Sequence, residues 1–126
     1  MVEMLIATSV LLVAVIGAYS AQLASMQAVR QTTDRSAALT DLEACLEQVM
    51  ATPAEQLPIP GSAFEHGQPV VAFDGLHLQE EQIVVTYPGY VPSGTVPDPL
   101  AIVLTATWVD SSGRAGTQSL RSMKTR

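Results

Sequence analysis

The N-terminal segment of the chain is an apolar run that carries a single acid. From Met1 to Tyr19 nearly every residue is apolar or small, and Glu3 is the one charged side chain. An ionisable group in an apolar helix costs roughly 2.5 to 3.5 kcal/mol at the centre of a bilayer, so it marks a functional site with a partner elsewhere. The first basic residue, Arg30, lies about 40 Å further along a straight helix. We therefore expect the partner of Glu3 to belong to another chain.

Two targeting interpretations compete for this segment, a cleaved secretory signal and a retained membrane or assembly helix. A signal begins with positive charge and ends in a small-residue cleavage site, whereas this start is acidic and Ala18-Tyr19-Ser20 is a weak match. We therefore expect residues 1–24 to be a retained apolar helix for the membrane or a filament core. Residues 25–126 are then expected to form a globular head.

Charge and cysteine content exclude some classes of function. The net charge of the 126 residues is −6, and the basic residues Arg114, Arg121, Lys124 and Arg126 gather at the C-terminus. An acidic surface argues against nucleic acid as a partner. One cysteine, Cys45, forms no disulfide within the chain, so packing must provide the stability.

One long helix is predicted from Val2 to about Thr52, because this stretch has no proline and one glycine, Gly17. At about 1.5 Å per residue it would span on the order of 75 Å, so we expect it to protrude from the head. Pro53 ends it, since proline cannot extend the hydrogen-bond ladder.

The second half of this helix is amphipathic. Apolar residues at spacings of three and four form a stripe that we expect to pack on a sheet. The acids are expected to face solvent or a neighbouring molecule: Asp34, Asp41, Glu43 and Glu47. The predicted helix–sheet core consists of Leu39, Leu42, Cys45, Leu46, Val49, Leu104 and Trp108.

Alternating apolar and polar residues predict a small antiparallel sheet after the helix, which gives an α+β fold. The clearest strand is Leu100–Val109, and Asp110-Ser111-Ser112-Gly113 predicts a hairpin turn into a polar strand ending near Met123. Basic residues at that end are expected to protect the sheet edge. The other predicted elements are a loop Pro53–Pro69, short strands Val70–Phe73 and Leu76–Leu78 joined at Asp74-Gly75, a strand Gln82–Tyr87 and a loop Pro88–Pro99.

The segment Met1-Val2-Glu3-Met4-Leu5-Ile6-Ala7 and the overall layout together resemble a type IV pilin. The segment is similar to the start of class III signal substrates, in which prepilin peptidase cuts before an apolar run that contains an early Glu. The predicted hairpin with Trp108 and Gly113 is similar to the terminal hairpin of minor pilins and type II secretion pseudopilins. In the family pattern the Glu lies two residues further from the start, which suggests two residues before Met1.

This resemblance implies a structural subunit of a type IV pilus or a related helical filament on a bacterial surface. The subunit would wait in the inner membrane, be processed by prepilin peptidase, acquire a methylated N-terminus, and polymerise with identical copies through the pilus assembly machinery. Glu3 would pair with the N-terminal amine of a neighbour. The assembly residues expected on this basis are Glu3, Met1, Val2, Met4, Leu5, Ala7, Leu11, Ala14, Gly17 and Ala18.

Two other functions stay open at this point. The chain is alternatively a minor pilin or pseudopilin that primes or caps a filament, or a single-span membrane protein whose acidic head binds a periplasmic ligand. Glu3 also has a plainer interpretation as a carboxylate at a membrane interface or helix N-terminus, where the helix dipole favours negative charge.

The sequence offers little support for an enzymatic function. His66 and His77 are the only histidines, and no metal-ligand or catalytic-triad spacing includes them, so we expect neither catalysis nor a cofactor or metal. His66 is interpreted as a loop residue and His77 as a residue on the outer face of a strand. Asp74 and Asp98 are better explained by turns than by a calcium site.

Three further side chains have expected places. Cys45 is expected to be a buried thiol rather than a reactive one. Tyr90 and Val91 are expected in an exposed contact loop, because apolar side chains at a surface often mark an interface.

Overall fold

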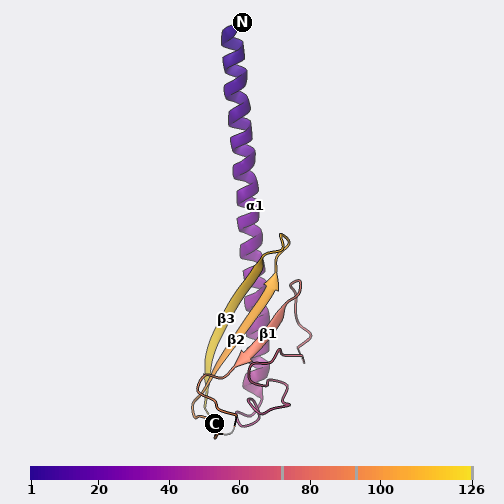
Figure 1. The fold of residues 1–126 in the computed structure, drawn as a ribbon, viewed down its shortest axis with the longest axis vertical. Helices are drawn as coiled ribbons and strands as arrows, with labels where there is room; N and C mark the ends of the chain where they lie inside the picture. The colour runs from indigo at the N-terminus through magenta and orange to yellow at the C-terminus, as the bar shows by residue number, and fades with distance from the viewer. Residues whose placement is uncertain (72, 93, 126) are drawn as a thin grey trace. The chain divides into compact units, whose positions relative to one another are not determined.

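The chain folds as predicted into an α+β structure. The computed structural model describes residues 1–71, 73–92 and 94–125. Helix α1 (Val2–Ala51) is followed by strands β1 (Gln82–Thr86), β2 (Leu100–Val109) and β3 (Ala115–Lys124). The strands form an antiparallel sheet in the order β1-β2-β3 (Figure 1). The chain divides into two compact units, Met1–Thr33 and Asp34–Arg126. This boundary lies further along the chain than the change in composition near residue 24.

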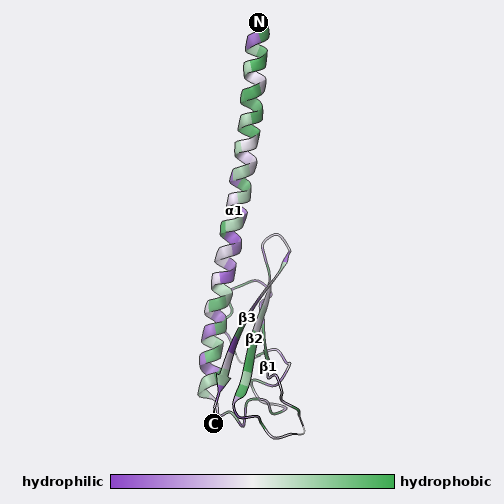
Figure 2. Cartoon of the chain, turned by 90° about the vertical axis from the view of Figure 1, so that its left-hand side faces the viewer, coloured by the Kyte–Doolittle hydropathy of each residue, from purple (hydrophilic) through white to green (hydrophobic). Residues whose placement is uncertain are grey.

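The Met1–Thr33 unit consists of the first part of α1. Its residues are good helix formers without proline, and the helical hydrogen bonding continues through Gly17. Every residue of this unit is exposed. Figure 2 shows hydrophobic residues on the N-terminal turns of α1 and a mixture of hydrophilic and hydrophobic residues further along.

In the Asp34–Arg126 unit the remaining turns of α1 pack on the sheet. The buried helix residues include Leu42, Cys45 and Val49, and they share one apolar cluster with the inward-facing residues of the strands. Burial at spacings of three and four on the helix meets burial at every second residue on β2. The fully buried members contributed by β1 and β2 are Ile83, Val85, Leu100, Ile102, Leu104 and Ala106.

The register of the hairpin explains the chemistry of β3. Trp108 lies opposite Gly116 and Leu104 opposite Leu120. A side chain at position 116 would overlap the indole ring of Trp108, so glycine leaves room for that ring. The turn follows the prediction: the Asp110 carboxylate accepts bonds from the backbone N–H groups of Ser112 and Arg114, and Gly113 has a φ of 78°.

The long loop after α1 is fixed by Tyr87. The Tyr87 hydroxyl donates to the carbonyl of Phe64 at 2.8 Å, and its backbone N–H donates to Nδ1 of His66 at 3.0 Å. Further along, Val70 N–H donates to the carbonyl of Ile83. The loop therefore runs beside β1, on the side of this strand that β2 leaves free.

The hairpin predicted around Asp74-Gly75 is wrong. Described residues between 70 and 78 form no strand, and residue 72 lies outside the described part. The Phe73 ring folds back over Gly75, where an added Cβ would lie 2.7 Å from the ring edge. Phe73 itself is buried in the core, so packing of the aromatic ring replaces strand pairing.

Two placements of charged residues also differ from the predictions. Asp41 is 1% exposed instead of facing solvent, because it accepts a hydrogen bond from the backbone N–H of His77 and also contacts the imidazole. His77 lies before β1 in a non-strand segment instead of on the face of a strand. Lys124 ends the edge strand β3, and its Nζ donates to the carbonyl of Met50 at 2.5 Å and of Thr52 at 2.6 Å. It thereby binds one carbonyl of the last turn of α1, which lacks a partner within the helix, and one carbonyl just after the helix. Arg126 lies outside the described residues.

Candidate functional site

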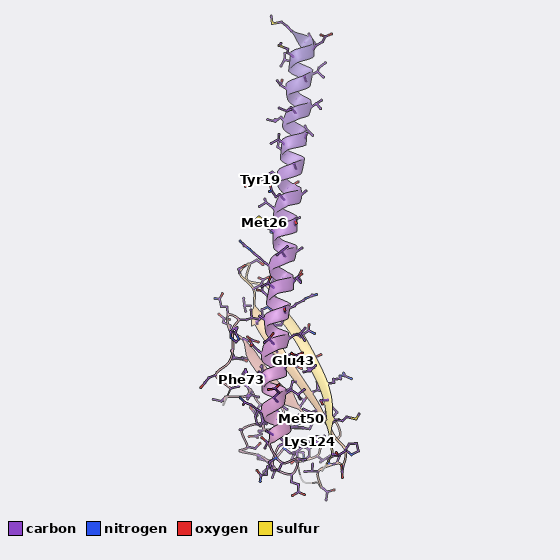
Figure 3. All side chains as sticks on the ribbon, turned by 180° about the vertical axis from the view of Figure 1, so that it is seen from behind. Tyr19, Met26, Glu43, Met50, Phe73 and Lys124 are labelled. Carbon is purple, nitrogen blue, oxygen red and sulfur yellow. The ribbon has the colours of Figure 1, made fainter. Side chains whose placement is uncertain are left out.

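The apolar N-terminal unit is the main candidate site. All residues predicted for assembly lie in this unit and are exposed, and all but Met1 belong to α1: Glu3, Met1, Val2, Met4, Leu5, Ala7, Leu11, Ala14, Gly17 and Ala18. Large apolar side chains are unusually open here, with Leu11 67% and Ile16 61% exposed. In Figure 3 the side chains of this part extend outward from the helix, Tyr19 and Met26 among them. By length and composition α1 is able to cross a membrane.

The helix brings half of these residues to one face. Steps of four, four, three and four connect Glu3, Ala7, Leu11, Ala14 and Ala18, and such steps return to the same side of a 3.6-residue helix. Three of the five are alanines, so most of this face is low in profile, with Leu11 as its large apolar side chain and one carboxylate at its start. We call it the narrow face. Leu5, Val2 and Gly17 lie on other sides of the helix.

The opposite face carries bulky residues. Leu5, Leu12, Ile16, Tyr19 and Leu23 follow one another at steps of seven, four, three and four. Both faces are apolar, but they differ in how closely another helix could approach. Small residues allow close contact between backbones in an apolar environment.

Several hydroxyl groups of this unit have partners within the helix. Thr8 Oγ1 donates to the carbonyl of Met4 at 2.9 Å, Ser9 Oγ to that of Leu5 at 2.8 Å, and Ser20 Oγ to that of Gly17 at 2.9 Å. Such bonds satisfy the donors without water. Glu3 differs, because within the described residues its carboxylate takes part in no ion pair or hydrogen bond. Glu3 is the one charged side chain before Arg30, so it is the group of this segment whose transfer to a dry environment costs most without a partner.

The residues predicted for the helix–sheet core lie in the other unit. Leu42, Cys45, Val49, Leu104 and Trp108 are buried. Leu46 is partly buried against the core, and Leu39 is half-buried. Burial raises the pKa of the Cys45 thiol to about 11, so this cysteine is a protonated packing group at neutral pH.

Tyr90 and Val91 lie in the loop between β1 and β2, of which residue 93 is outside the described part. Val91 is 59% exposed, while Tyr90 is half-buried, with its ring centroid 5.9 Å from that of His66. The two residues therefore have different environments, although the sequence suggested one contact surface.

A surface depression of the second unit offers little chemistry. It has a volume of about 480 Å³ and is lined by Ser62, Ala63, Glu65, Gln68, Pro69 and Val71. Its carboxylate, Glu65, accepts a hydrogen bond from the backbone N–H of Gly61 at 2.9 Å. Among the described residues, no group of three or more His, Cys, Asp or Glu side chains is arranged to hold a metal ion.

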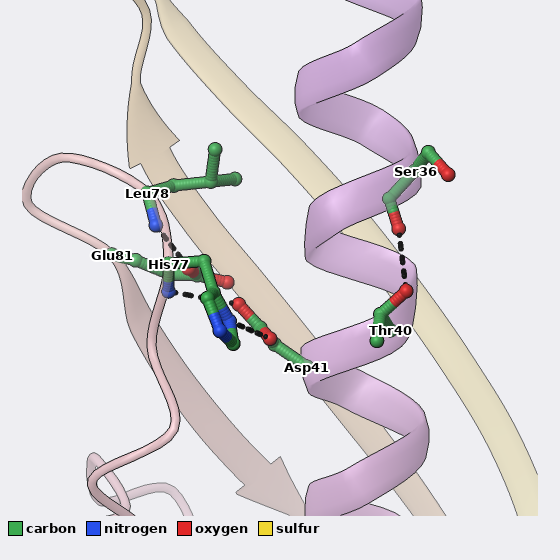
Figure 4. Close-up of polar contacts among 6 residues, drawn as sticks. All are labelled: Ser36, Thr40, Asp41, His77, Leu78 and Glu81. Atoms are coloured by element: carbon green, nitrogen blue, oxygen red, sulfur yellow. Dashed lines mark hydrogen bonds and ion pairs between the residues drawn. The ribbon is translucent and has the colours of Figure 1, made fainter.

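Sequence reasoning missed a polar cluster formed by Asp41, His77 and Glu81. Asp41 Oδ2 accepts from His77 N–H at 3.0 Å, and Oδ1 lies 2.6 Å from His77 Nδ1 (Figure 4). Glu81 Oε2 accepts from Leu78 N–H at 3.0 Å. Asp41 lies three residues after Ala38 and four before Cys45, so its helical spacing was a signal for burial.

Comparisons of the chain with protein-family models, with curated proteins and with solved structures gave no match. The functional argument therefore depends on the residues and geometry described above.

Proposed function

We propose that this chain is a structural subunit of a type IV pilus or a related helical surface filament. In this proposal residues 1–24, the apolar part of the Met1–Thr33 unit, wait in a membrane and then pack among the same segments of sister copies. The observation that carries the proposal is an exposed helix, apolar on all sides, whose one acid has no partner among the described residues.

The physical reason for polymerisation is burial. Removing one large apolar side chain from water is worth about 1.5 to 3 kcal/mol, and this segment carries many that are more than half exposed. A helix that is apolar on all sides is stable in lipid or in a bundle. Because both environments are dry, transfer between them leaves the apolar contribution nearly unchanged.

The narrow face supplies a route to close packing. Ala7, Ala14 and Ala18 let a second helix approach along the side that carries Glu3. A neighbour that packs there brings its own groups near the carboxylate. The resemblance to pilins makes the N-terminal amine of that neighbour the proposed partner, and a paired charge in a dry core costs much less than an unpaired one.

The test is a Glu3→Gln substitution in cells that display the filament. Breaking a buried ion pair costs roughly 3–5 kcal/mol, so we expect filament yield to fall more than about tenfold while the subunit still enters the membrane. Sheared surface material is quantified by electron microscopy, and membrane fractions are quantified by immunoblot. Glu43→Gln, which removes an exposed acid from the second unit, is the matched control. Normal filament yield from Glu3→Gln would contradict the proposal.

A second candidate is a minor pilin or a type II secretion pseudopilin that primes or caps a filament. The observation favouring it is the hairpin of β2 and β3, in which Trp108 packs over Gly116 beside the turn Asp110–Gly113. Immunogold labelling of the fibres separates the candidates. Labels along the whole fibre support the main proposal, labels confined to tips support the second, and a chain found in membranes without fibres is a single-span membrane protein.

A further inference from the structure

Beside Asp41, the buried carboxyl group of Glu81 has one oxygen whose bonding is incomplete without a hydrogen. Glu81 is 6% exposed, and its Oε1 atom is buried without a hydrogen-bond partner. The side chains of Glu81 and Asp41 point toward one another in Figure 4. Two ionised carboxylates side by side in a buried place repel each other strongly. A neutral carboxylic acid removes that conflict, because its O–H is a donor and its other oxygen remains an acceptor.

We propose that Glu81 stays protonated and that its O–H donates a hydrogen bond to Asp41, so that one proton latches segment 77–81 to helix α1 and its loss releases the segment. In the closed latch Glu81 Oε2 accepts from Leu78 N–H, and the two oxygens of Asp41 face His77. The latch lies in the Asp34–Arg126 unit, so it is independent of the proposed filament role of the N-terminal unit.

Few other charged groups compete for this proton. Within the described residues, the one ion pair at either carboxylate is that of Asp41 with His77, and no Lys or Arg takes part. Gln79 hydrogen-bonds to Val109, which brings the β2–β3 turn near, but the Asp110 carboxylate there is bonded to Ser112 and Arg114. Glu80 is exposed.

The direction of the pH response follows from the environment of Glu81. Burial and then the neighbouring Asp41 raise the pKa of Glu81, while the bond from Leu78 opposes this shift. The closed latch therefore has its full stability below the ordinary pKa of a glutamate and loses it as pH rises through the raised pKa. Between these two values the opening constant should rise about tenfold per pH unit, which corresponds to one proton.

Opening has a structural consequence. Leu78 lies between His77 and Glu81 and is partly buried against the core. Release of the segment therefore exposes an apolar side chain of the head only when the proton is lost.

Two measurements on the full-length protein in non-ionic detergent micelles test the latch. A carbon-13 NMR titration of the carboxyl groups should show Glu81 titrating above the ordinary glutamate range. The hydrogen-exchange rates of the His77 and Leu78 amides, after correction for intrinsic exchange, should rise about tenfold per pH unit between the ordinary and the raised pKa of Glu81. A Glu81 signal that titrates in the ordinary range would overturn the proposal without any variant.

Three variants locate the proton. Glu81→Gln keeps an acceptor for Leu78 N–H and places a permanent donor toward Asp41, so protection of Leu78 should become independent of pH. Glu80→Gln makes the same change at the adjacent exposed position and should retain the response. His77→Gln removes the imidazole and should also retain it. Loss of the response in His77→Gln, with retention in Glu81→Gln, would assign the proton to the imidazole and overturn the latch.

Discussion

The two units of this chain satisfy their apolar residues in different ways. In Asp34–Arg126 the apolar side chains of one helix, three strands and the loops between them fill a common core. In Met1–Thr33 the apolar side chains are at least as dense, yet each of them is exposed. Both units contain turns of the same helix, α1, and neither part of that helix contains proline.

The difference shows that helix formation and burial are separate requirements. Helix propensity is satisfied along the whole of α1, but only the second unit supplies an intramolecular surface for its helix. The first unit can bury its side chains only in lipid or against other molecules. Substitutions should therefore change folding stability in one unit and association in the other.

The largest contrast is expected between Leu42→Ala and Leu11→Ala. Leu42 is fully buried, so truncation should lower the free energy of unfolding by about 2–5 kcal/mol. Leu11 is 67% exposed, so its truncation should change the free energy of unfolding by less than about 0.5 kcal/mol. Urea denaturation in detergent micelles, followed by the fluorescence of Trp108, measures the head alone, since this is the one tryptophan of the chain. Equal losses in both variants would remove the distinction between the units.

The sequence predicted the regular elements well because their patterns are local. The bounds of β2 matched a run in which alternate residues are apolar, and the end of α1 followed from Pro53. The segment from Phe73 to Leu78 was predicted wrongly because its structure depends on distant contacts. Asp41 is 36 positions from His77 in the chain, and no local pattern encodes that hydrogen bond.

Only part of the candidate site could be predicted from the sequence. The exposed apolar helix and the lone acid Glu3 could be recognised from composition. The division of this helix into a small-residue face and a bulky face needed the helical geometry. The cluster around Glu81 was missed because a run of acids, Glu80 and Glu81, usually indicates a solvated surface, whereas here one of the two is buried.

Two glycine substitutions, one in each unit, should have the next largest effects on stability. Gly116→Ala should destabilise the head by about 1–3 kcal/mol, because the added methyl group overlaps the buried ring of Trp108. The methyl group added by Gly17→Ala would lie within 4 Å of no other atom, so this substitution should leave the stability of the head unchanged. It should stabilise the helical state of the first unit by about 1 kcal/mol, because alanine has a higher helix propensity than glycine. Trp108 fluorescence during urea denaturation measures the first effect, and hydrogen exchange of the amides near residue 17 measures the second. A neutral Gly116→Ala would show that the ring has room to move.

The smallest effect is expected at Lys124, which connects the end of β3 to the end of α1 inside the second unit. Its Nζ donates to the carbonyls of Met50 and Thr52, and a charged donor there also interacts favourably with the helix dipole. Because the contact is partly exposed, Lys124→Met should lower the free energy of unfolding by about 1 kcal/mol. Arg121→Met, at an exposed position of the same strand, is the matched control and should be neutral. If both variants unfold like the parent protein, the apolar core alone accounts for the stability of the head, and the contrast between the two units reduces to burial of apolar surface.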